Sequence, residues 1–275
     1  MKTTNRLVGA FVAMSAMTVA ANAATVTDDF SAASLNAMWQ VNDNAGSYNT
    51  GGGTSQTGGY YLIHNTFVEG ASNISTSMGT LGAGDTGRVD GIIRTDQFND
   101  GRWSNQVVIY FNNENWVGLR LAYENGATGF YRQGAVNGVY SALDGPAVAS
   151  GNVQWAHNIL GVQLTPTNIN FYGSTIGNDY TNETNIDANV TLLASVARPA
   201  SFQGQAYAIL GKGFAASNLD PAYLNHNGGA TVGNADNYIS YARIITPDPV
   251  PEPTTLGLLA LVGLPLLSRR GRRVS

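Results

Sequence analysis

The chain contains no cysteine among its 275 residues, and its only lysines are Lys2 and Lys212. Without cysteine the protein has neither a disulfide framework nor a thiol nucleophile, so an exported domain must be stable through its core alone. Charged residues make up only 12% of the chain, whereas glycine alone contributes 33 residues. This composition is typical of polar turns between strands and argues against charged helix surfaces.

The few charges are distributed unevenly along the chain. Residues 24–249 carry 17 acidic and 8 basic side chains, a net charge of −9, against −4 for the whole sequence. Because such a surface repels phosphate backbones, we expect no nucleic-acid partner.

The first 23 residues have the pattern of a secretory signal peptide. Lys2 and Arg6 precede an uncharged apolar stretch at residues 7–20, and Ala21-Asn22-Ala23 supplies small residues at the cleavage positions. Signal peptidase would then cut between Ala23 and Ala24. No cysteine follows this site, which excludes a lipid-anchored lipoprotein.

Residues 24–245 show the alternation of β-strands. Val117, Leu119 and Leu121 alternate with other residues in 116–123, and a polar insert at 112–115 separates this run from an apolar run at 107–111. Such a pair predicts a hairpin with one face in a core. Further strands are expected at residues 60–64, 88–95, 128–132, 159–165, 168–172, 206–210 and 238–245.

These segments predict one all-β domain, a two-sheet antiparallel jelly-roll sandwich, because no stretch has a sustained apolar stripe at helical spacing. Thr165-Pro166-Thr167 is expected to form a tight turn, since proline presets the backbone angle that the turn requires. The Gly-rich residues 46–59 and the residues 211–236 are expected to be long loops.

The C-terminal 30 residues have three parts in order. Four prolines on alternate positions make residues 246–253 a stiff, extended linker. Residues 254–268 form an apolar membrane segment that is shorter than the ~20 residues of a straight spanning helix. A cluster of arginines in residues 269–275 acts as the positive stop and cytoplasmic tail. These stop-transfer residues are Arg269, Arg270, Arg272 and Arg273.

This tail resembles the PEP-CTERM sorting signal. Its motif would be Val250, Pro251, Glu252 and Pro253, followed by the apolar stretch and the arginines. The resemblance implies export by a bacterium with a Gram-negative envelope and recognition by an exosortase, a membrane-embedded processing enzyme. It also implies an association with exopolysaccharide and biofilm matrix, and the same tail carries an ice-binding-protein C-terminal label. We therefore expect a membrane-anchored intermediate, followed by residence at the cell surface or in the extracellular matrix.

The domain itself is similar to concanavalin A-like lectin and glucanase sandwiches, including laminin-G-like members. Asp29-Phe30, Leu35 and Trp39 resemble their opening strand. The segment from Trp155 through residues 162–172 and the closing residues 238–245 also resemble parts of these domains. The resemblance implies a jelly roll whose concave face or loop rim binds carbohydrate.

The sequence contains few groups that could form a catalytic site. Glucanases of the resembled fold place carboxylates in a Glu-x-Asp-x-x-Glu arrangement, which none of the four glutamates of the domain forms. The nearest acidic pairs are Asp85 with Asp90 and Asp96 with Asp100. The three histidines lack metal-ligand spacing, and no G-x-S-x-G motif is present. From these absences we expect that the protein is not an enzyme.

Aromatic residues are the candidates for ligand binding, because a flat ring covers the C–H face of a sugar. Trp116 and Arg120 are four residues apart on one expected strand and therefore share a face, which points away from the core if Val117, Leu119 and Leu121 point into it. An exposed tryptophan beside an arginine would be a binding site, but we favour the alternative that Trp116 covers a neighbouring strand with an arginine stacked on it. We expect Trp39 and Trp155 to lie in the core. The candidate binding residues are Trp103, Trp116, Arg120 and Tyr131.

We expect no cofactor. Asp96, Asn99 and Asp100 offer oxygen ligands for calcium, but a hydrogen-bonded Asx-turn explains them better because a full ligand set is missing.

The main functional prediction is an exosortase-sorted surface or matrix protein with a non-catalytic sandwich that binds polysaccharide. The alternatives are a purely structural surface protein and a divergent glycoside hydrolase.

Overall fold

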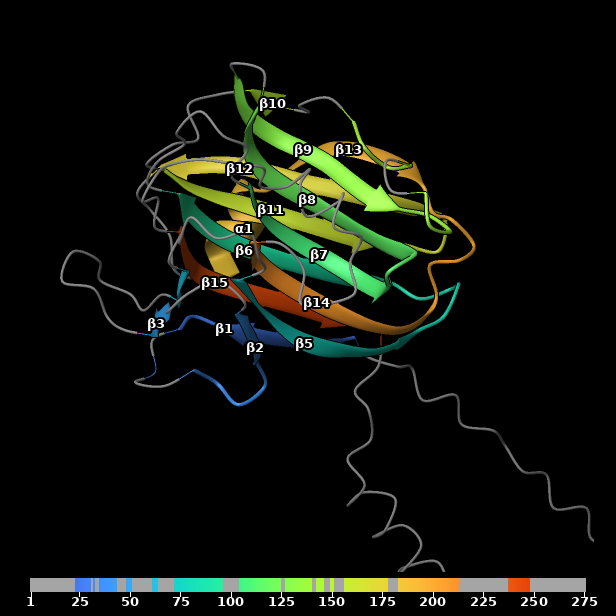
Figure 1. The fold of residues 1–275 in the computed structure, drawn as a ribbon, viewed down its shortest axis with the longest axis horizontal. Coiled ribbons are helices and arrows are strands. Elements are labelled where there is room, and N and C mark those ends of the chain that lie inside the picture. Colours follow the sequence, from blue (N-terminus) through green and yellow to red (C-terminus); the bar gives the residue numbers. More distant parts are fainter. Residues whose placement is uncertain are drawn as a thin grey trace, which may run out of the picture.

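The fold was analysed on a computed structural model of the whole chain (Figure 1). The structure describes residues 23–30, 32, 35–43, 48–50, 61–63, 72–95, 104–124, 127–139, 142–145, 149–150, 156–177, 183–212 and 237–247. These residues are almost entirely β-structure, with a single helix in the described part. The strands are β1 (Ala24–Asp28), β2 (Gln40–Asp43), β3 (Tyr48–Thr50), β4 (Tyr61–Ile63), β5 (Ser72–Leu81), β6 (Gly87–Thr95), β7 (Ser104–Asn112), β8 (Asn115–Glu124), β9 (Ala127–Ala135), β10 (Ala149–Ser150), β11 (His157–Leu164), β12 (Asn168–Gly177), β13 (Thr191–Ala197), β14 (Gly204–Lys212) and β15 (Asn237–Thr246), and the helix is α1 (Glu183–Asn189).

Two antiparallel sheets form a sandwich. Sheet A has the order β13-β12-β11-β6-β15-β4-β3, with β1 also paired to β15, and sheet B has the order β10-β9-β8-β7-β14-β5-β2. In Figure 1 the strands β7, β8 and β9 of sheet B overlap β6, β11 and β12 of sheet A. The first and last strands are neighbours, because Ala24 pairs with Thr246 and Asp28 with Ala242. The prediction of an all-β, two-sheet antiparallel sandwich is confirmed.

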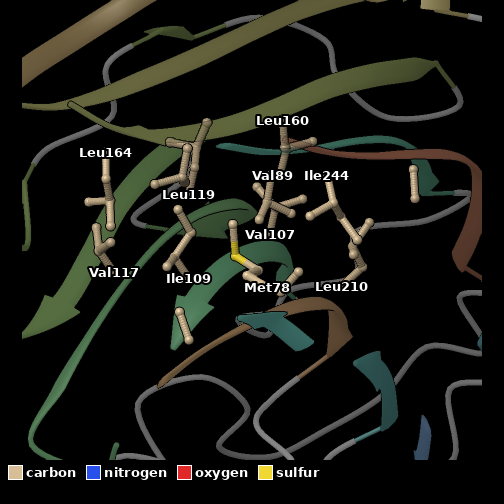
Figure 2. Close-up of a cluster of buried hydrophobic side chains, with 14 of the residues drawn as sticks. Met78, Val89, Val107, Ile109, Val117, Leu119, Leu160, Leu164, Leu210 and Ile244 are labelled. Carbon is tan, nitrogen blue, oxygen red and sulfur yellow. The ribbon is translucent and has the colours of Figure 1, made fainter. Parts of the chain in front are cut away.

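The main core lies between the two sheets. Strand alternation sends Val107, Ile109, Val117 and Leu119 of sheet B inward, where they meet residues such as Leu160 of sheet A (Figure 2). All five are completely buried. Burial of this apolar surface, at about 25 cal/mol per Å², is the main contribution holding the cysteine-free sandwich together. The expected inward positions of Val117, Leu119 and Leu121 are thus confirmed.

The residues that resemble an opening strand pack together at one end of the core. Phe30 and Trp39 are buried and stack with ring centroids 6.1 Å apart. Trp39 Nε1 donates a hydrogen bond to Asp28 Oδ2 at 2.7 Å. The expectation that Trp39 belongs to the core is confirmed, whereas Trp155 lies outside the described residues.

Helix α1 covers part of the outer side of sheet A. Its Ile186 forms a second apolar cluster with Ile92, Ile159 and Tyr241 of the sheet. Arg243 on β15 binds the same helix through an ion pair of 2.6 Å with Asp187. No helix was predicted from the sequence, because seven residues are too few to show a sustained helical stripe.

Most strand predictions are confirmed, and several strands were missed. The expected hairpin turns around residues 112–115 and 165–167 are present, since β7 pairs with β8 and β11 with β12. The notable misses are β5, β13 and β3, of which β3 falls inside the residues 46–59 that we expected to be a loop. β5 and β13 are rich in Ser, Thr and Ala, so their apolar alternation is weak in the sequence.

Arg198 joins three segments at one end of the sandwich. Its guanidinium donates hydrogen bonds to the carbonyl oxygens of Gly82, Asp85, Thr165 and Phe202 at 2.6 to 3.2 Å. Burial lowers the pKa of Arg198, because carbonyl dipoles replace only part of the lost hydration. A planar, multivalent donor is needed here, since one group must satisfy several carbonyls that point at a single spot.

The predictions for the N-terminal and C-terminal segments are not tested by the described residues and stay predictions. Strand β1 begins at Ala24, the residue expected to follow the signal cleavage. The expected signal peptide up to residue 22, the PEP motif, the apolar segment and the arginine tail lie outside the described residues. Within the part of the chain that the structure describes, no helix is long and apolar enough to cross a membrane.

Candidate functional site

The outer face of sheet B brings together aromatic and polar side chains from four neighbouring strands. Cross-strand register places residues of β14, β7, β8 and β9 side by side in rows. An aromatic row consists of Tyr207, Tyr110 and Trp116, ending at Ala135. A middle row consists of Ile209, Val108, Gly118 and Gln133. A polar row consists of Gly211, Gln106, Arg120 and Tyr131. We call these three rows the outer face of sheet B.

The three aromatic side chains of the aromatic row differ in their exposure to solvent. Tyr207 is 39% exposed, Tyr110 is half-buried and Trp116 is completely buried. The hydroxyl of Tyr110 donates to Asn113 Oδ1 at 2.6 Å, in the turn between β7 and β8. This bond fixes one edge of the Tyr110 ring. The accessible aromatic surface of the row is therefore that of Tyr207 and Tyr110.

The polar row lies four residues along the same strands from the aromatic row, and the middle row separates the two. Gln133 Nε2 donates to Gln106 Oε1, and both side chains are buried. The guanidinium carbon of Arg120 lies 5.4 Å from the ring centroid of Tyr131, a cation–π arrangement. Arg120 itself is only partly buried. The polar and middle rows thus carry guanidinium and amide groups on the same face as the aromatic row.

Gly118 leaves space for its neighbours in the middle row, because it has no side chain. A Cβ at this position would lie 3.0 Å from the Val107 carbonyl oxygen and 3.4 Å from Gln133 Nε2. A side chain here would therefore press on the amide of Gln133. The missing side chain of Gly118 therefore leaves room for the amide of Gln133 between Trp116 and Arg120.

Trp116 and Arg120 share the outer face of sheet B, as expected. Trp116 is completely buried, which agrees with the favoured alternative of a tryptophan that covers its neighbours and not with an exposed one. Arg120 stacks on Tyr131, which is also buried. Further interactions within the chain involve Gln106, Trp116, Arg120 and Gln133. Strand alternation does not reveal such interactions, so it does not predict how exposed each of these side chains is. Trp103 lies outside the described residues.

Sequence reasoning missed Tyr110, Tyr207, Gln106 and Gln133. The alternation of β7 contained a signal, since Gln106, Val108 and Tyr110 form its second face. Only the pairing of β14 with β7, however, brings Tyr207 beside Tyr110.

The acidic pairs of the sequence do not form a catalytic pair among the described residues. Asp85 closes a turn by accepting a hydrogen bond from the Gly82 amide at 2.7 Å. Asp90 lies on the outer side of sheet A, where it binds Arg88 and Arg243 at 2.8 and 2.9 Å. None of the carboxylates whose side chains are described lies on the outer face of sheet B.

Metal-binding side chains are also dispersed. In the described ranges no three His, Asp or Glu residues gather as a potential metal site. The calcium candidates Asp96, Asn99 and Asp100 lie outside those ranges, so that expectation stays open. Of the histidines, His157 is described; it is buried at the start of β11, and its Nδ1 donates to the Gly177 carbonyl oxygen at 3.3 Å.

Comparison by sequence finds no relative for the chain. No protein-family model matches it, and no curated protein matches it.

Comparison by structure finds carbohydrate-active proteins with the same fold. The Crh5 transglycosylase, solved in complex with NAG, has a TM-score of 0.52 at 15% identity, and the match covers 82% of this chain and 85% of that one. The GH43 protein BlXynB from Bacillus licheniformis has a TM-score of 0.52 at 14% identity, covering 80% of this chain and 39% of that one. The Bacteroides ovatus protein "Xyloglucan PUL GH43B" has a TM-score of 0.50 at 12% identity, covering 80% and 38%. This chain thus spans about two fifths of the two GH43 chains.

These matches overturn the expectation that the protein is not an enzyme. The sandwich has the same fold as the Crh5 transglycosylase over most of both chains, so the absence of linear motifs was an insufficient ground for excluding catalysis. A spacing search tests only carboxylates on a single strand. A folded sheet also brings together groups from strands and loops that are far apart in the sequence. The identities of 12–15% establish a shared fold and no more.

Proposed function

We propose that this protein is carbohydrate-active, a divergent relative of glycoside hydrolases and transglycosylases that holds a polysaccharide on the outer face of sheet B. The observation that carries the proposal is the pairing of Tyr207 with Tyr110 on the same face as the row of Gln106 and Arg120, from which the middle row separates it. Sugar rings have apolar C–H faces and polar rims, so aromatic rings beside amide and guanidinium donors are complementary to them. The shared fold with carbohydrate-active proteins supports this choice.

Binding would begin at the accessible side chains. Tyr207, Tyr110 and Arg120 are the members of the two rows that solvent reaches. The buried amides of Gln106 and Gln133 already bind each other, so a sugar that reaches them must replace interactions within the chain. With a net charge of −9 on residues 24–249, the domain favours a neutral polysaccharide over an acidic one.

Cleavage or transfer of a glycosidic bond needs two carboxyl groups, one acting as the acid and the other as nucleophile or base. The backbone of β8 continues its alternation from positions 116, 118 and 120 to Glu124, which ends the strand. Asp96 and Asp100 precede β7 in the sequence. These three carboxylates are the ones to test.

The binding experiment compares Tyr207→Ala with Leu192→Ala, an exposed apolar control on sheet A. Isothermal calorimetry with soluble β-glucan, xylan and chito-oligosaccharides should show at least about tenfold weaker binding for Tyr207→Ala, which corresponds to about 1.4 kcal/mol. The control should bind like the unmodified protein. Equal affinity of both variants for every ligand would place the binding site elsewhere.

The catalytic experiment follows product formation from the ligand that binds. Glu124→Gln, Asp96→Asn and Asp100→Asn are tested one at a time by chromatography of the oligosaccharide products. Loss of turnover in one variant, with binding retained, would identify a catalytic carboxyl group. Binding without any turnover by the unmodified protein would reject the hydrolase and transglycosylase part of the proposal.

The two terminal segments support a cellular route for the same protein. Signal peptidase would release the chain at Ala24, and an exosortase-type enzyme would recognise residues 250–253 in a membrane-anchored intermediate before delivery to the surface or matrix. The basis is the order of the extended prolines, apolar stretch and arginines in the sequence. Replacing Pro251 and Pro253 by alanine should leave the protein in the membrane fraction of its native host. Unchanged release would refute the sorting step.

A further inference from the structure

Four polar side chains stand side by side in a row across the outer side of sheet A. Cross-strand register aligns one residue from each of the neighbouring strands β6, β11, β12 and β13. These residues are Arg88, Gln163, Asn170 and Ser195. Directly opposed residues have Cβ atoms about 4.5–5.5 Å apart, so each side chain reaches the next. We call these four residues the sheet A ladder.

The hydrogen bonds of the sheet A ladder run in one direction, toward Gln163. Ser195 Oγ donates to Asn170 Oδ1 at 2.8 Å, and Asn170 Nδ2 donates to Gln163 Oε1 at 3.2 Å. The hydroxyl of Tyr172, in the adjacent row, donates to the same Gln163 oxygen at 2.9 Å. Since Oε1 accepts both bonds, the two N–H groups of Gln163 Nε2 are left without an acceptor among the described residues.

Arg88, the next member of the ladder, is held in a similar way. Its Nε donates to Asp90 Oδ1 at 2.8 Å, and its guanidinium carbon lies 4.4 Å from the ring centroid of Tyr172. Its Nη2 is buried without an acceptor, so the exposed 12% of the side chain presents Nη1. Contacts within the chain thus fix two neighbouring donors, Arg88 Nη1 and Gln163 Nε2. A ligand does not have to order them, which favours binding.

Helix α1 leaves the sheet A ladder accessible. It packs on Ile92 and Ile159, which lie four residues along β6 and β11 from the ladder. Gln163 and Asn170 are partly exposed, and Ser195 is exposed. A ligand can therefore approach the row from outside the sandwich.

We propose that the sheet A ladder binds one unit of a neutral saccharide. The two fixed donors bind hydroxyl oxygens of the sugar, and the exposed hydroxyl of Ser195 extends the row of polar contacts. The half-buried ring of Tyr172 adds apolar surface beside the row. A sugar combines a polar rim with apolar C–H groups, so it matches this combination of side chains.

The charges around the ladder favour a neutral ligand over an anion. The positive charge of Arg88 is already paired with Asp90. Arg243 binds the same carboxylate and also the exposed carboxylates of Asp187 and Glu183. The two arginines therefore face three carboxylates, and residues 24–249 as a whole carry a net charge of −9. No positive charge is left over for an acidic group.

This site would give one chain two separate binding surfaces. The sheet A ladder and the outer face of sheet B lie on the outer sides of opposite sheets of the sandwich. One copy of the protein can then hold two polysaccharide molecules and cross-link them without forming an oligomer. The cross-linking rests on the proposed function of sheet B, whereas binding at the ladder does not.

The first experiment removes the two donors and keeps the ladder. In Gln163→Glu the carboxylate still accepts from Asn170 and Tyr172, but it has no N–H group and pairs with Arg88. Calorimetry of the full chain with xylotetraose, cellotetraose and chitotetraose should show binding at this site at least about tenfold weaker. Gln203→Glu is the matched control, because Gln203 is exposed in the turn between β13 and β14 and receives the same charge. Circular dichroism confirms that each variant is folded.

The second experiment separates the ladder from the site on sheet B by counting bound ligands. The unmodified chain should bind two molecules of the same tetrasaccharide, and Gln163→Glu and Tyr207→Ala should each bind one. A single site that only Tyr207→Ala removes would overturn the ladder site and support the site on sheet B. A single site that only Gln163→Glu removes would do the reverse. The ladder site is also overturned if Gln163→Glu binds every probe like the unmodified chain, or if the unmodified chain binds none at about 10 mM.

Discussion

Arg243 Nε donates to Asp90 Oδ2 over 2.9 Å, although 153 residues separate the two in the sequence. The two residues are direct partners on neighbouring strands, Arg243 on β15 and Asp90 on β6. Arg88 binds the other oxygen of the same carboxylate and lies over the ring of Tyr172. Burial raises the pKa of Asp90, while the two guanidinium groups act in the opposite direction. The closing strand of the domain is thus attached to sheet A by a buried, charged hydrogen-bond network.

Asp90→Asn should destabilise the domain by about 3–5 kcal/mol, because it removes the buried carboxylate that both Arg88 and Arg243 bind and leaves Arg243 with the exposed carboxylates of Asp187 and Glu183. Urea unfolding measures the change. Asp187→Asn is the control, since the Asp187 side chain is 61% exposed and an exposed pair contributes at most about 1 kcal/mol. Similar losses in the two variants would mean that the buried position of Asp90 is unimportant.

Gly161→Ala should also destabilise the fold, by about 1–3 kcal/mol from overpacking. A Cβ on Gly161 would overlap Asp90 Oδ1, because the two residues are register partners on β11 and β6. Gly84→Ala is the matched control, since a Cβ there has no atom within 4 Å. Thermal unfolding measures the midpoint temperature of both variants. An unchanged midpoint for Gly161→Ala would show that Asp90 can move without loss of stability.

Arg198→Lys should lower the free energy of unfolding by about 2–4 kcal/mol, although the charge is kept. One ammonium group cannot reach the four carbonyl oxygens that the guanidinium binds, and each hydrogen bond to a charged group contributes about 1.5–3 kcal/mol. Chemical denaturation with urea measures the loss. A change below about 0.5 kcal/mol would indicate that water replaces the lost donors.

His157→Gln should reduce the dependence of stability on pH between about 6.5 and about 4. Burial lowers the pKa of His157 to about 4, so in this window the unfolded chain takes up a proton that the folded chain does not bind. Stability therefore falls as the pH drops from 6.5 towards 4, and this contribution disappears with the histidine. Urea midpoints at pH 7, 5.5 and 4.5 for both proteins test the difference, and parallel pH profiles would rule out His157 as a source.

The local pattern of the sequence predicted the strands whose two faces differ clearly. In β8, Val117, Leu119 and Leu121 alternate with Trp116, Gly118 and Arg120, so the faces could be assigned before the fold was known. In β13 that contrast is missing. The strand forms because Ala194 and Val196 pack against a core supplied by other strands, which a single segment does not reveal.

The candidate site was predicted only in part for a related reason. That Trp116 and Arg120 share a face follows from the two-residue repeat of a strand. Their burial depends on neighbours that alternation does not specify, so the sequence left two alternatives for Trp116, and the structure shows that it is buried. The exclusion of catalysis was wrong for a similar reason, since it relied on linear spacing.

The sequence by itself determined the all-β class, the absence of disulfides, the acidic character of the domain and most strand positions, because these depend on composition and on contacts within one hairpin. The terminal segments add a sorting prediction that rests on the sequence alone. Only the tertiary structure decided which strands are neighbours beyond the two predicted hairpins. That arrangement placed Tyr207 beside Tyr110, joined Arg243 to Asp90 and left β13 at the margin of sheet A. The reason is that pairing between distant strands is set by the packing of the whole core, and no local segment encodes it.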